Sequence, residues 1–265
     1  MSSFIGFFVI FMTLCVIGTG TASGGPQEFI SGTSKECQGC DLQGANFKRL
    51  NLSGANLGEA NLEGANFHRA DLSGANLSGA NLTDANLNLA DLRKANLAGA
   101  KLTQAFLYQA DLSAANLAGA DLSDVRMQKS RLSRAVLNGA VLDRAIAYES
   151  RMTSADLAGA SLREVNLTSG NLRGADLTGT HIVNTRLVRA NLSRAKLVNA
   201  RVENTDLYFA NLSQTDLSGS AFSGVRFEGA GLDGAKTDGA TLERCLLPDG
   251  RYVREDGLAA ALAGN

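Results

Sequence analysis

Few residues of this chain have the types and spacing that chemistry at a site requires. Cys37 and Cys40 are separated by two residues, and the only histidines of the chain are His68 and His181. Two cysteines at this spacing form a redox pair, half of a zinc site or a structural disulfide. No second pair follows, and no βαβ context for redox chemistry surrounds this one. The sequence therefore favours a small disulfide, as is common in oxidising compartments.

Other signatures of catalysis or ligand binding do not occur. No glycine-rich phosphate loop follows a predicted strand, and no metal-ligand spacing is present. Most Ser and Asp residues fall at turn positions of a repeat, where a catalytic triad would lack a pocket. The 25 Lys and Arg residues nearly balance the 26 Asp and Glu residues, which gives no reason to expect a nucleic-acid partner. The sequence therefore predicts a protein that is not an enzyme and has no cofactor, metal or small-molecule substrate.

The element that must position these residues is a five-residue repeat, which runs from Cys40 to Leu242 without insertion or deletion. The third residue of each unit is Leu at 31 of 41 positions, and the residue two before it is Ala at 28 of 41. Neither position ever carries Asp, Glu, Lys or Arg. A period of five is neither helical nor that of a strand, and it indicates a solenoid whose units bury their apolar sides against their neighbours. Cys245 continues the register and is expected to be a buried free thiol.

The units resemble the consensus A-(D/N)-L-x-x of the pentapeptide-repeat family, as in ANFKR at 45–49 and ANLSG at 75–79. The resemblance implies an all-β fold, a right-handed quadrilateral β-helix in which each unit forms one side and four units complete a coil. Residues 40–247 would then make about ten coils, stacked at roughly 4.8 Å. Each inward Leu would stack on the one 20 residues away, and burying one Leu contributes roughly 1.5–3 kcal/mol.

Residues 1–23 have the features of a secretory signal peptide. The apolar run FIGFFVIFMTLCVI at 4–17 is followed by small residues and a cleavage site near Ala22 or Ser23. The alternative is an uncleaved N-terminal segment that anchors the protein to a membrane. Residues 24–39 are assigned to a linker and an N-terminal cap, in which the Cys37–Cys40 disulfide closes the solenoid. The predicted location is an exported one: the periplasm, a thylakoid lumen or the extracellular space.

Residues 248–265 are expected to form a C-terminal cap. A turn signal at Pro248-Asp249-Gly250 precedes a segment, 256–262, with the composition of a short helix. A hairpin with a helix would cover the last coil, because solenoids need caps to stay soluble. Within the repeat, Ala147 replaces a central Leu and is expected to leave a gap or to draw in a neighbour.

Sorting the outward residues by a 20-residue period distinguishes the sides of the predicted rod. On the side centred on Leu97, Leu117, Leu157 and Leu177, here called the glycine face, most units end in Gly, and the residue before it is often Ala. Two interpretations remain open: a turn that prefers glycine, and a flat surface for self-association, which makes a homodimer possible. The glycines are Gly79, Gly99, Gly119, Gly139, Gly159, Gly179, Gly219 and Gly239.

The side centred on Phe47, Leu107, Met127, Leu187 and Phe227, here called the basic face, combines arginine with aromatic residues. This composition is enriched at protein interfaces. A solvated face that happens to hold the bulky residues is the alternative. The candidate partner-binding residues are Arg69, Tyr108, Arg126, Tyr148, Arg186, Arg189, Tyr208 and Arg226.

Together these features predict an exported, non-enzymatic solenoid that acts as a structural or protein–protein interaction scaffold for an unknown protein partner. The resemblance implies one alternative function, because some members of the family mimic DNA and protect topoisomerases. Mimicry requires a strongly acidic surface and a cytoplasmic location. This chain has a net charge of −1, a basic face and a predicted signal peptide, which argue against it.

Overall fold

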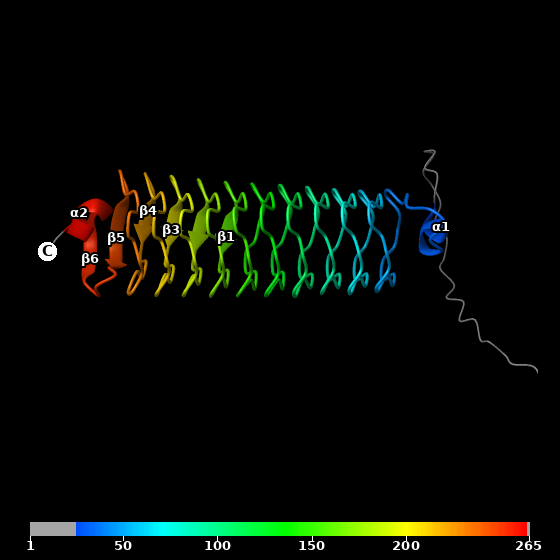
Figure 1. The fold of residues 1–265 in the computed structure, drawn as a ribbon, viewed down its shortest axis with the longest axis horizontal. Coiled ribbons are helices and arrows are strands. Elements are labelled where there is room, and N and C mark those ends of the chain that lie inside the picture. The colour runs from blue at the N-terminus through cyan, green and yellow to red at the C-terminus, as the bar shows by residue number, and fades with distance from the viewer. Residues whose placement is uncertain (1–24, 264–265) are drawn as a thin grey trace, which may run out of the picture.

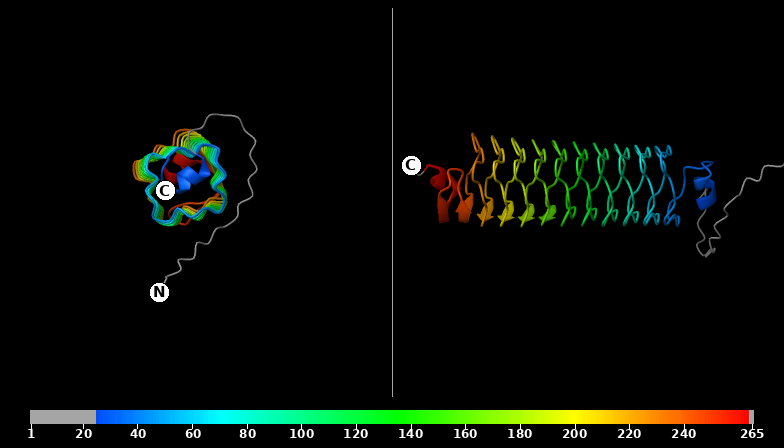
Figure 2. Two further views of the ribbon diagram at one scale, coloured as in Figure 1. Left: turned by 90° about the vertical axis from the view of Figure 1, so that its right-hand side faces the viewer. Right: turned by 90° about the horizontal axis from the view of Figure 1, so that it is seen from below.

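Each pentapeptide lies beside the unit 20 residues later in the chain. The structure, a computed structural model, describes residues 25–263. The amide of Leu112 donates to the carbonyl of Arg131 (2.6 Å), and the amide of Asp111 donates to the carbonyl of Ala90 (3.0 Å), so each coil is bonded to the coils before and after it. The result is a straight rod of stacked coils (Figure 1), which has a four-sided outline when seen from its end (Figure 2). The predicted quadrilateral β-helix is confirmed.

The corners of the rod are turns that close every five residues. The amide of Ala115 donates to the carbonyl of Leu112 (3.0 Å), and Ala114 between them has a φ of 59°. A positive φ at this place is what a type II turn requires, and it favours glycine. Many units nevertheless hold a larger residue there, such as Arg49 (φ 61°) or Phe209 (φ 53°). The stacked coils therefore impose this conformation on whatever residue occupies the corner.

The inward positions form one continuous apolar core. Leu112 and Leu132, on neighbouring coils, are both fully buried, as are nearly all residues at the two inward positions of each unit. The largest buried side chains lie near the two ends, where the rings of Phe47 and Phe67 stack at 5.0 Å between centroids. Ala147 is also buried, so the shortened centre does not open the core to solvent.

Seven inward corner positions carry hydroxyls instead of alanine, and sequence analysis treated them only as small residues. Six of the hydroxyls donate to backbone carbonyls, as Ser130 Oγ does to Met127 O (2.7 Å). Ser150 Oγ is the exception, since it has no hydrogen-bond partner among the described residues. The seven are Ser130, Ser150, Thr180, Thr185, Thr205, Thr215 and Ser220.

Regular strands occur on one side of the rod, in its C-terminal part. Parallel strands β1 (Ser161–Arg163), β2 (His181–Val183), β3 (Arg201–Glu203), β4 (Ala221–Ser223) and β5 (Thr241–Leu246) pair in that order, and β6 (Tyr252–Gly257) pairs antiparallel with β5. None of the parallel strands begins with Asn or Asp. Elsewhere in the rod, an Asn or Asp at this position accepts a hydrogen bond from the amide two residues later, as Asp111 Oδ1 does from Ser113 (3.0 Å).

The sheet of regular strands contains fewer turns than the number of coils predicted for the whole repeat. The continuous sheet of β1 to β5 covers about four turns, whereas about ten were predicted. Outside the sheet, single-residue bridges at the same 20-residue spacing run from Glu36–Asn56 to Arg226–Leu246. Most of the rod is therefore held by isolated bridges between coils rather than by three-residue strands.

Both ends of the described chain carry short additional elements. At the N-terminal end, helix α1 (Pro26–Ile30) buries Phe29, whose ring meets that of Phe47 edge-on at 5.7 Å. This helix lies within residues 24–39, for which the sequence predicts a linker and an N-terminal cap. At the other end, the β5–β6 hairpin leads into helix α2 (Leu258–Ala263), which buries Leu258 and Ala261. The predicted hairpin and helix cap is confirmed.

Neither described helix has the length or the apolar composition needed to cross a lipid bilayer. The predicted signal peptide, residues 1–23, lies outside the described residues.

Candidate functional site

The Cys37–Cys40 pair forms a disulfide at the N-terminal end of the rod, with the two Cα atoms 5.2 Å apart. Cys37 is buried, and the amide of Cys40 donates to its carbonyl (3.2 Å) across a repeat-type turn. Cys37 therefore occupies a central, Leu-type position, and Cys40 the Ala-type position after it. The disulfide predicted from the spacing is confirmed. Sequence analysis placed only Cys40 in the repeat register, because it began the repeat one unit too late.

The two histidines do not form a site together. His68 lies on the basic face and His181 on β2, at an exposed position of a different side. Desolvation lowers the pKa of His68, and the neighbouring charges of Arg69, Lys48 and Arg49 lower it further. No group of three or more His, Cys, Asp or Glu side chains that could hold a metal ion occurs within residues 25–263.

On the basic face, three of the candidate residues lie on successive coils in the middle of the rod. The guanidinium of Arg126 lies over the ring of Phe106, 5.2 Å from its centroid. Tyr108 is exposed, and the amide of Lys129 donates to the carbonyl of Tyr148 (3.1 Å). Tyr108, Arg126, Tyr148 and Phe106 are named here the central cluster.

The other large group begins two coils after Tyr148, towards the C-terminus. The guanidinium of Arg226 lies 4.0 Å from the ring centroid of Tyr208, whose ring meets that of Phe209 edge-on at 4.5 Å. Arg186 and Arg189 lie on the coil before these rings, since the amide of Arg189 donates to the carbonyl of Tyr208 (2.8 Å). Arg186, Arg189, Tyr208, Phe209 and Arg226 are named here the C-terminal cluster. Arg69 belongs to neither cluster.

Ion pairing separates the arginines of the basic face into two kinds. Arg226 is bound to Glu228 (2.7 Å) and lies 3.9 Å from Asp206, and these contacts raise its pKa. By contrast, Arg126, Arg186 and Arg189 form no ion pair with any residue of the described chain. The partner Glu228 lies two residues after Arg226 in the same pentapeptide and was visible in the sequence. Asp206 lies on the coil between Arg186 and Arg226, and only the structure shows that it approaches Arg226. Arg226 mainly orders the rings around it, whereas the other three keep their charge available.

Phe209 was missing from the candidate residues, although the structure makes it the most exposed aromatic side chain of the basic face. It is 54% exposed and has a φ of 53°, in the left-handed region that disfavours residues with a Cβ. A Cβ added to Gly229 would lie 3.0 Å from its ring, so the ring lies over that glycine on the next coil. An aromatic residue followed by glycine 20 residues later was the available sequence signal.

On the glycine face, the space beside the corner glycines differs from coil to coil, and Asn199 lies against Gly219. Gly99, Gly119, Gly139, Gly159 and Gly179 all have a positive φ, and an added Cβ at any of them would meet no atom within 4 Å. The turn favours glycine but does not require it, because other sides hold larger residues at the same φ. No described feature of this face identifies a ligand.

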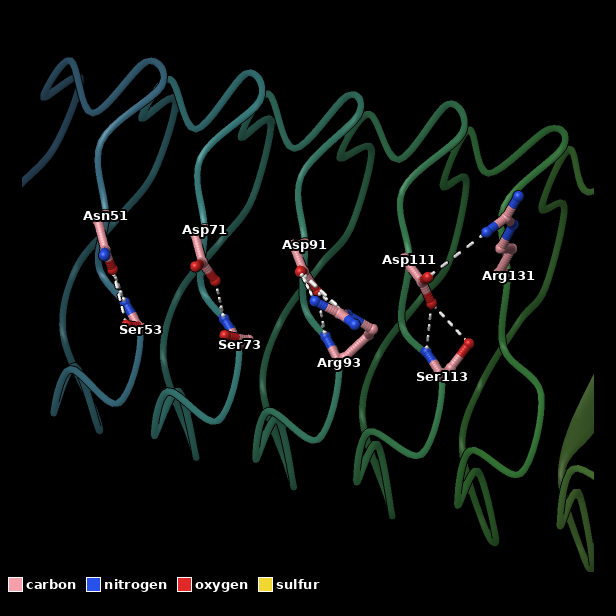
Figure 3. Close-up of polar contacts among 9 residues, drawn as sticks. All are labelled: Asn51, Ser53, Asp71, Ser73, Asp91, Arg93, Asp111, Ser113 and Arg131. Carbon is pink, nitrogen blue, oxygen red and sulfur yellow. Dashed lines mark hydrogen bonds and ion pairs between the residues drawn. The ribbon is translucent and has the colours of Figure 1, made fainter.

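A column of charged residues runs along a third side, the side that follows the basic face in chain order. Asn51, Asp71, Asp91, Asp111 and Arg131 lie one above the other on successive coils (Figure 3). Asp111 lies 3.9 Å from Arg131, and Asp91 is bound by Arg93 of its own unit, which lowers the Asp91 pKa. Arg151 and Asn171 continue the column. We call this the Asp–Arg column.

Two open hollows occur near the C-terminal end, with volumes of about 420 and 560 Å³. Arg201 and Glu203 line the first and are paired with each other, as are Glu243 and Arg244 (2.9 Å). The charges in this hollow therefore satisfy one another.

Comparisons with known proteins agree with the repeat. The family described as "Pentapeptide repeats" matches with 8 copies, at residues 36–69, 51–88, 90–128, 130–168, 171–207 and 210–247. No curated protein sequence matches the chain.

Among solved structures, HetL from the cyanobacterium Nostoc sp. strain PCC 7120, a pentapeptide-repeat protein involved in heterocyst differentiation regulation, is 30% identical. The match covers 86% of this chain and 97% of HetL, with a TM-score of 0.36. Full-length QnrB1, a plasmid-mediated fluoroquinolone resistance protein, is 19% identical over 77% of this chain and 91% of its own, with a TM-score of 0.44.

A pentapeptide-repeat protein from the thylakoid lumen of Arabidopsis thaliana is 30% identical over 41% of this chain and 68% of its own, with a TM-score of 0.17. The unbroken five-residue period, the buried Leu and Ala columns and the family match over residues 36–247 lead to one conclusion: the chain belongs to the pentapeptide-repeat family.

Proposed function

We propose that the protein is a non-enzymatic binding scaffold that holds a protein partner on its basic face. One observation carries the proposal: Phe209 is exposed although it is a large aromatic residue in a left-handed backbone conformation. The ring is only partly covered, by Gly229 and Tyr208, so more than half of this large apolar side chain stays in contact with solvent. A partner that covers the ring would recover the burial.

The partner that this face fits carries acidic side chains beside apolar ones. Arg126, Arg186 and Arg189 form no ion pair within the described chain. Exposed Tyr108 lies on the coil next to Arg126, and exposed Phe209 lies on the coil next to Arg189. Arginine on an aromatic surface, with its planar group free, is well suited to bind a carboxylate by two parallel hydrogen bonds. Burial of the aromatic rings would supply most of the affinity, and the arginines would fix the register.

We further propose that the protein works outside the reducing cytoplasm. The Cys37–Cys40 disulfide supports this location, because such bonds persist in oxidising compartments. The test is fractionation of a full-length protein tagged at its C-terminus. The proposal predicts a product that has lost its N-terminal segment, or is anchored by it, in an exported fraction. An intact product in the cytoplasm would contradict export.

Binding is tested with proteins captured from the compartment in which the chain is found. Wild type is compared with a variant that combines Arg126→Glu and Arg186→Glu, and with a separate Phe209→Ala variant. The control combines Lys101→Glu and Arg163→Glu, two exposed cations on another side of the rod. The proposal predicts that both basic-face variants lose the same specific partner by at least tenfold, whereas the control retains it.

Folding of each variant is checked by its circular dichroism and its urea midpoint, which surface changes should leave nearly unchanged. Equal capture by wild type and by both folded basic-face variants would refute the basic face as the binding surface. Loss of the partner in the control as well would show that only overall charge matters.

A further inference from the structure

The Asp–Arg column keeps like charges stacked on neighbouring coils. Bridges pair Asp71 with Asp91 and Asp91 with Asp111, which makes the first part of the column acidic (Figure 3). A further bridge pairs Arg131 with Arg151, which makes the second part basic. Like charges directly opposite each other across paired strands are destabilising. Asp91 is already paired with Arg93, and Asp111 with Arg131, so the charges of the column that form no ion pair within the described chain are Asp71 and Arg151. An acidic group on a complementary surface would neutralise Arg151.

A second copy of the same chain offers that complementary surface. When two copies meet face to face about a two-fold axis perpendicular to the rods, the rods run antiparallel and each column faces its own counterpart. If the axis passes between the coils of Asp111 and Arg131, then Asp111 of each copy faces Arg131 of the other, and Asp91 faces Arg151. Four ion pairs result, because each pairing occurs twice.

The other charged residues on this side are compatible with the same arrangement. They are Lys94, Arg134, Arg173 and Arg194, together with Asp71 and Arg93. In the antiparallel pair, the residues that face them in the second copy are uncharged. In the same order, these are Ser154, Ala114, Ser73, Gly54, Asn171 and Thr153. No charge between Asn51 and Arg194 on this side therefore faces a like charge directly.

Among the antiparallel registers of residues 51–194, only this one forms ion pairs between the two copies without placing a charge opposite a like charge. Moving the axis by one coil towards the N-terminus places Asp91 opposite Asp111, and moving it by one coil the other way places Arg131 opposite Arg151. Parallel rods about a two-fold axis along their length would keep every residue at the height of its own copy, so no Asp of the column would lie level with Arg131 or Arg151. We propose that the protein forms an antiparallel homodimer through this side, centred between Asp111 and Arg131.

The size of the contact predicts a weak dimer. Eight coils at about 4.8 Å span about 34 Å, and three outward positions at about 3.3 Å give a width of about 10 Å, which is roughly 350 Å² per partner. Stable interfaces bury about 1,200–2,000 Å² in total, so the dimer should form only at high concentration. Its ion pairs are exposed at the rim and should weaken as salt is added.

The geometry also relates the dimer to the basic face. The two-fold axis lies in the plane of the contact and runs across the rods. Rotation about it therefore leaves the left and right flanks of the contact on the left and right in both copies. The basic faces of both copies therefore point the same way. This consequence rests on the proposed function, but the dimer itself does not. Two adjacent basic faces would bind a long or repeated partner more tightly than one.

Sedimentation equilibrium over about 10 µM to about 1 mM tests the dimer, at about 50 mM and about 500 mM salt. The proposal predicts a dimer at low salt that weakens at least tenfold at high salt. Arg131→Asp with Arg151→Asp should abolish it, and so should Asp91→Arg with Asp111→Arg. All four changes together restore complementarity and should restore the dimer. The control is again Lys101→Glu with Arg163→Glu, which should dimerise like wild type.

A cross-linking experiment checks the register independently. Ser53 of one copy faces Ser193 of the other, whereas the two copies of Ser53 lie about 34 Å apart. A mixture of Ser53→Cys and Ser193→Cys proteins should form an intermolecular disulfide under mild oxidation, and neither variant should do so alone. The proposal is overturned by a wild type that stays monomeric throughout, by a dimer that survives both paired reversals, or by a fourfold variant that stays monomeric.

Discussion

Replacing Ser150 by alanine should stabilise the protein. Ser150 Oγ is buried and has no hydrogen-bond partner within residues 25–263, whereas Ser130 Oγ, in the same column one coil earlier, donates to Met127 O (2.7 Å). Both residues occupy a position that is usually Ala in this chain. The two serines therefore form a matched pair that differs in a single hydrogen bond.

The expected magnitudes have opposite signs. A buried polar group without a partner costs roughly 1–3 kcal/mol, so Ser150→Ala should raise the free energy of unfolding by about 1 kcal/mol or more. Ser130→Ala removes a satisfied hydrogen bond and should lower it by about 0.5–1.5 kcal/mol. The two variants should therefore differ by roughly 2 kcal/mol, well above the error of comparing mutants.

Urea unfolding of wild type and both variants, followed by circular dichroism, measures the difference as a shift in midpoint at constant slope. The two positions lie on neighbouring coils, so any loss of cooperativity in the repeat array should affect both variants alike. A thermal scan should show the same order, with about 2–4 °C per kcal/mol for a chain of this size. Two variants that are destabilised equally would refute the reasoning, because Ser150 would then be hydrogen-bonded in solution like Ser130.

The remaining predictions concern packing, pH and thiol reactivity. Leu112→Ala, in the middle of the core, should lower the free energy of unfolding by about 2–5 kcal/mol, measured by urea denaturation, and a loss below about 1 kcal/mol would contradict the stacked core. Hydrogen bonds from Arg144 hold the pKa of Asp124 below 3.8, so this carboxylate contributes stability above that pH and loses it as the pH falls through the lowered pKa. The urea midpoint of Asp124→Asn should accordingly depend less on pH below about pH 4 than that of wild type. Burial raises the pKa of the Cys245 thiol, so it should react with a thiol reagent only as the protein unfolds, and rapid reaction of the native protein would place it at the surface.

The rod was predictable because a fixed five-residue period makes every unit bury the same two positions against its neighbours. Once Leu recurs every five residues with no charge at the inward positions, only one side of each unit can face the core. Burial of Leu112 and Leu132 follows from that pattern alone. The disulfide was predictable for a similar reason, since the spacing of Cys37 and Cys40 suits a tight turn.

The features that sequence analysis missed depend on contacts between distant or non-repeating residues. Within the predicted linker and N-terminal cap, helix α1 was not foreseen, because five residues carry little periodic signal. Its position is fixed by Phe29 packing on Phe47. Arg226 is paired with Glu228 of its own unit and with Asp206 of the coil before it, whereas Arg186 forms no ion pair within the described chain. Residue types on the basic face were therefore predictable, but not which charges remain available.

The fixed 20-residue stacking also sets what insertions and deletions can do to the surfaces of this protein. Removing one complete coil between Arg126 and Arg186 would bring the two aromatic clusters closer by about 4.8 Å and leave both on the same side. Removing a single pentapeptide there would instead rotate everything after it by a quarter turn. The C-terminal cluster would then point away from the central one, although every remaining unit could still bury its Leu. The number of residues between the clusters therefore sets the angle between them around the rod axis. Only insertions or deletions in multiples of 20 residues keep both clusters on one shared surface.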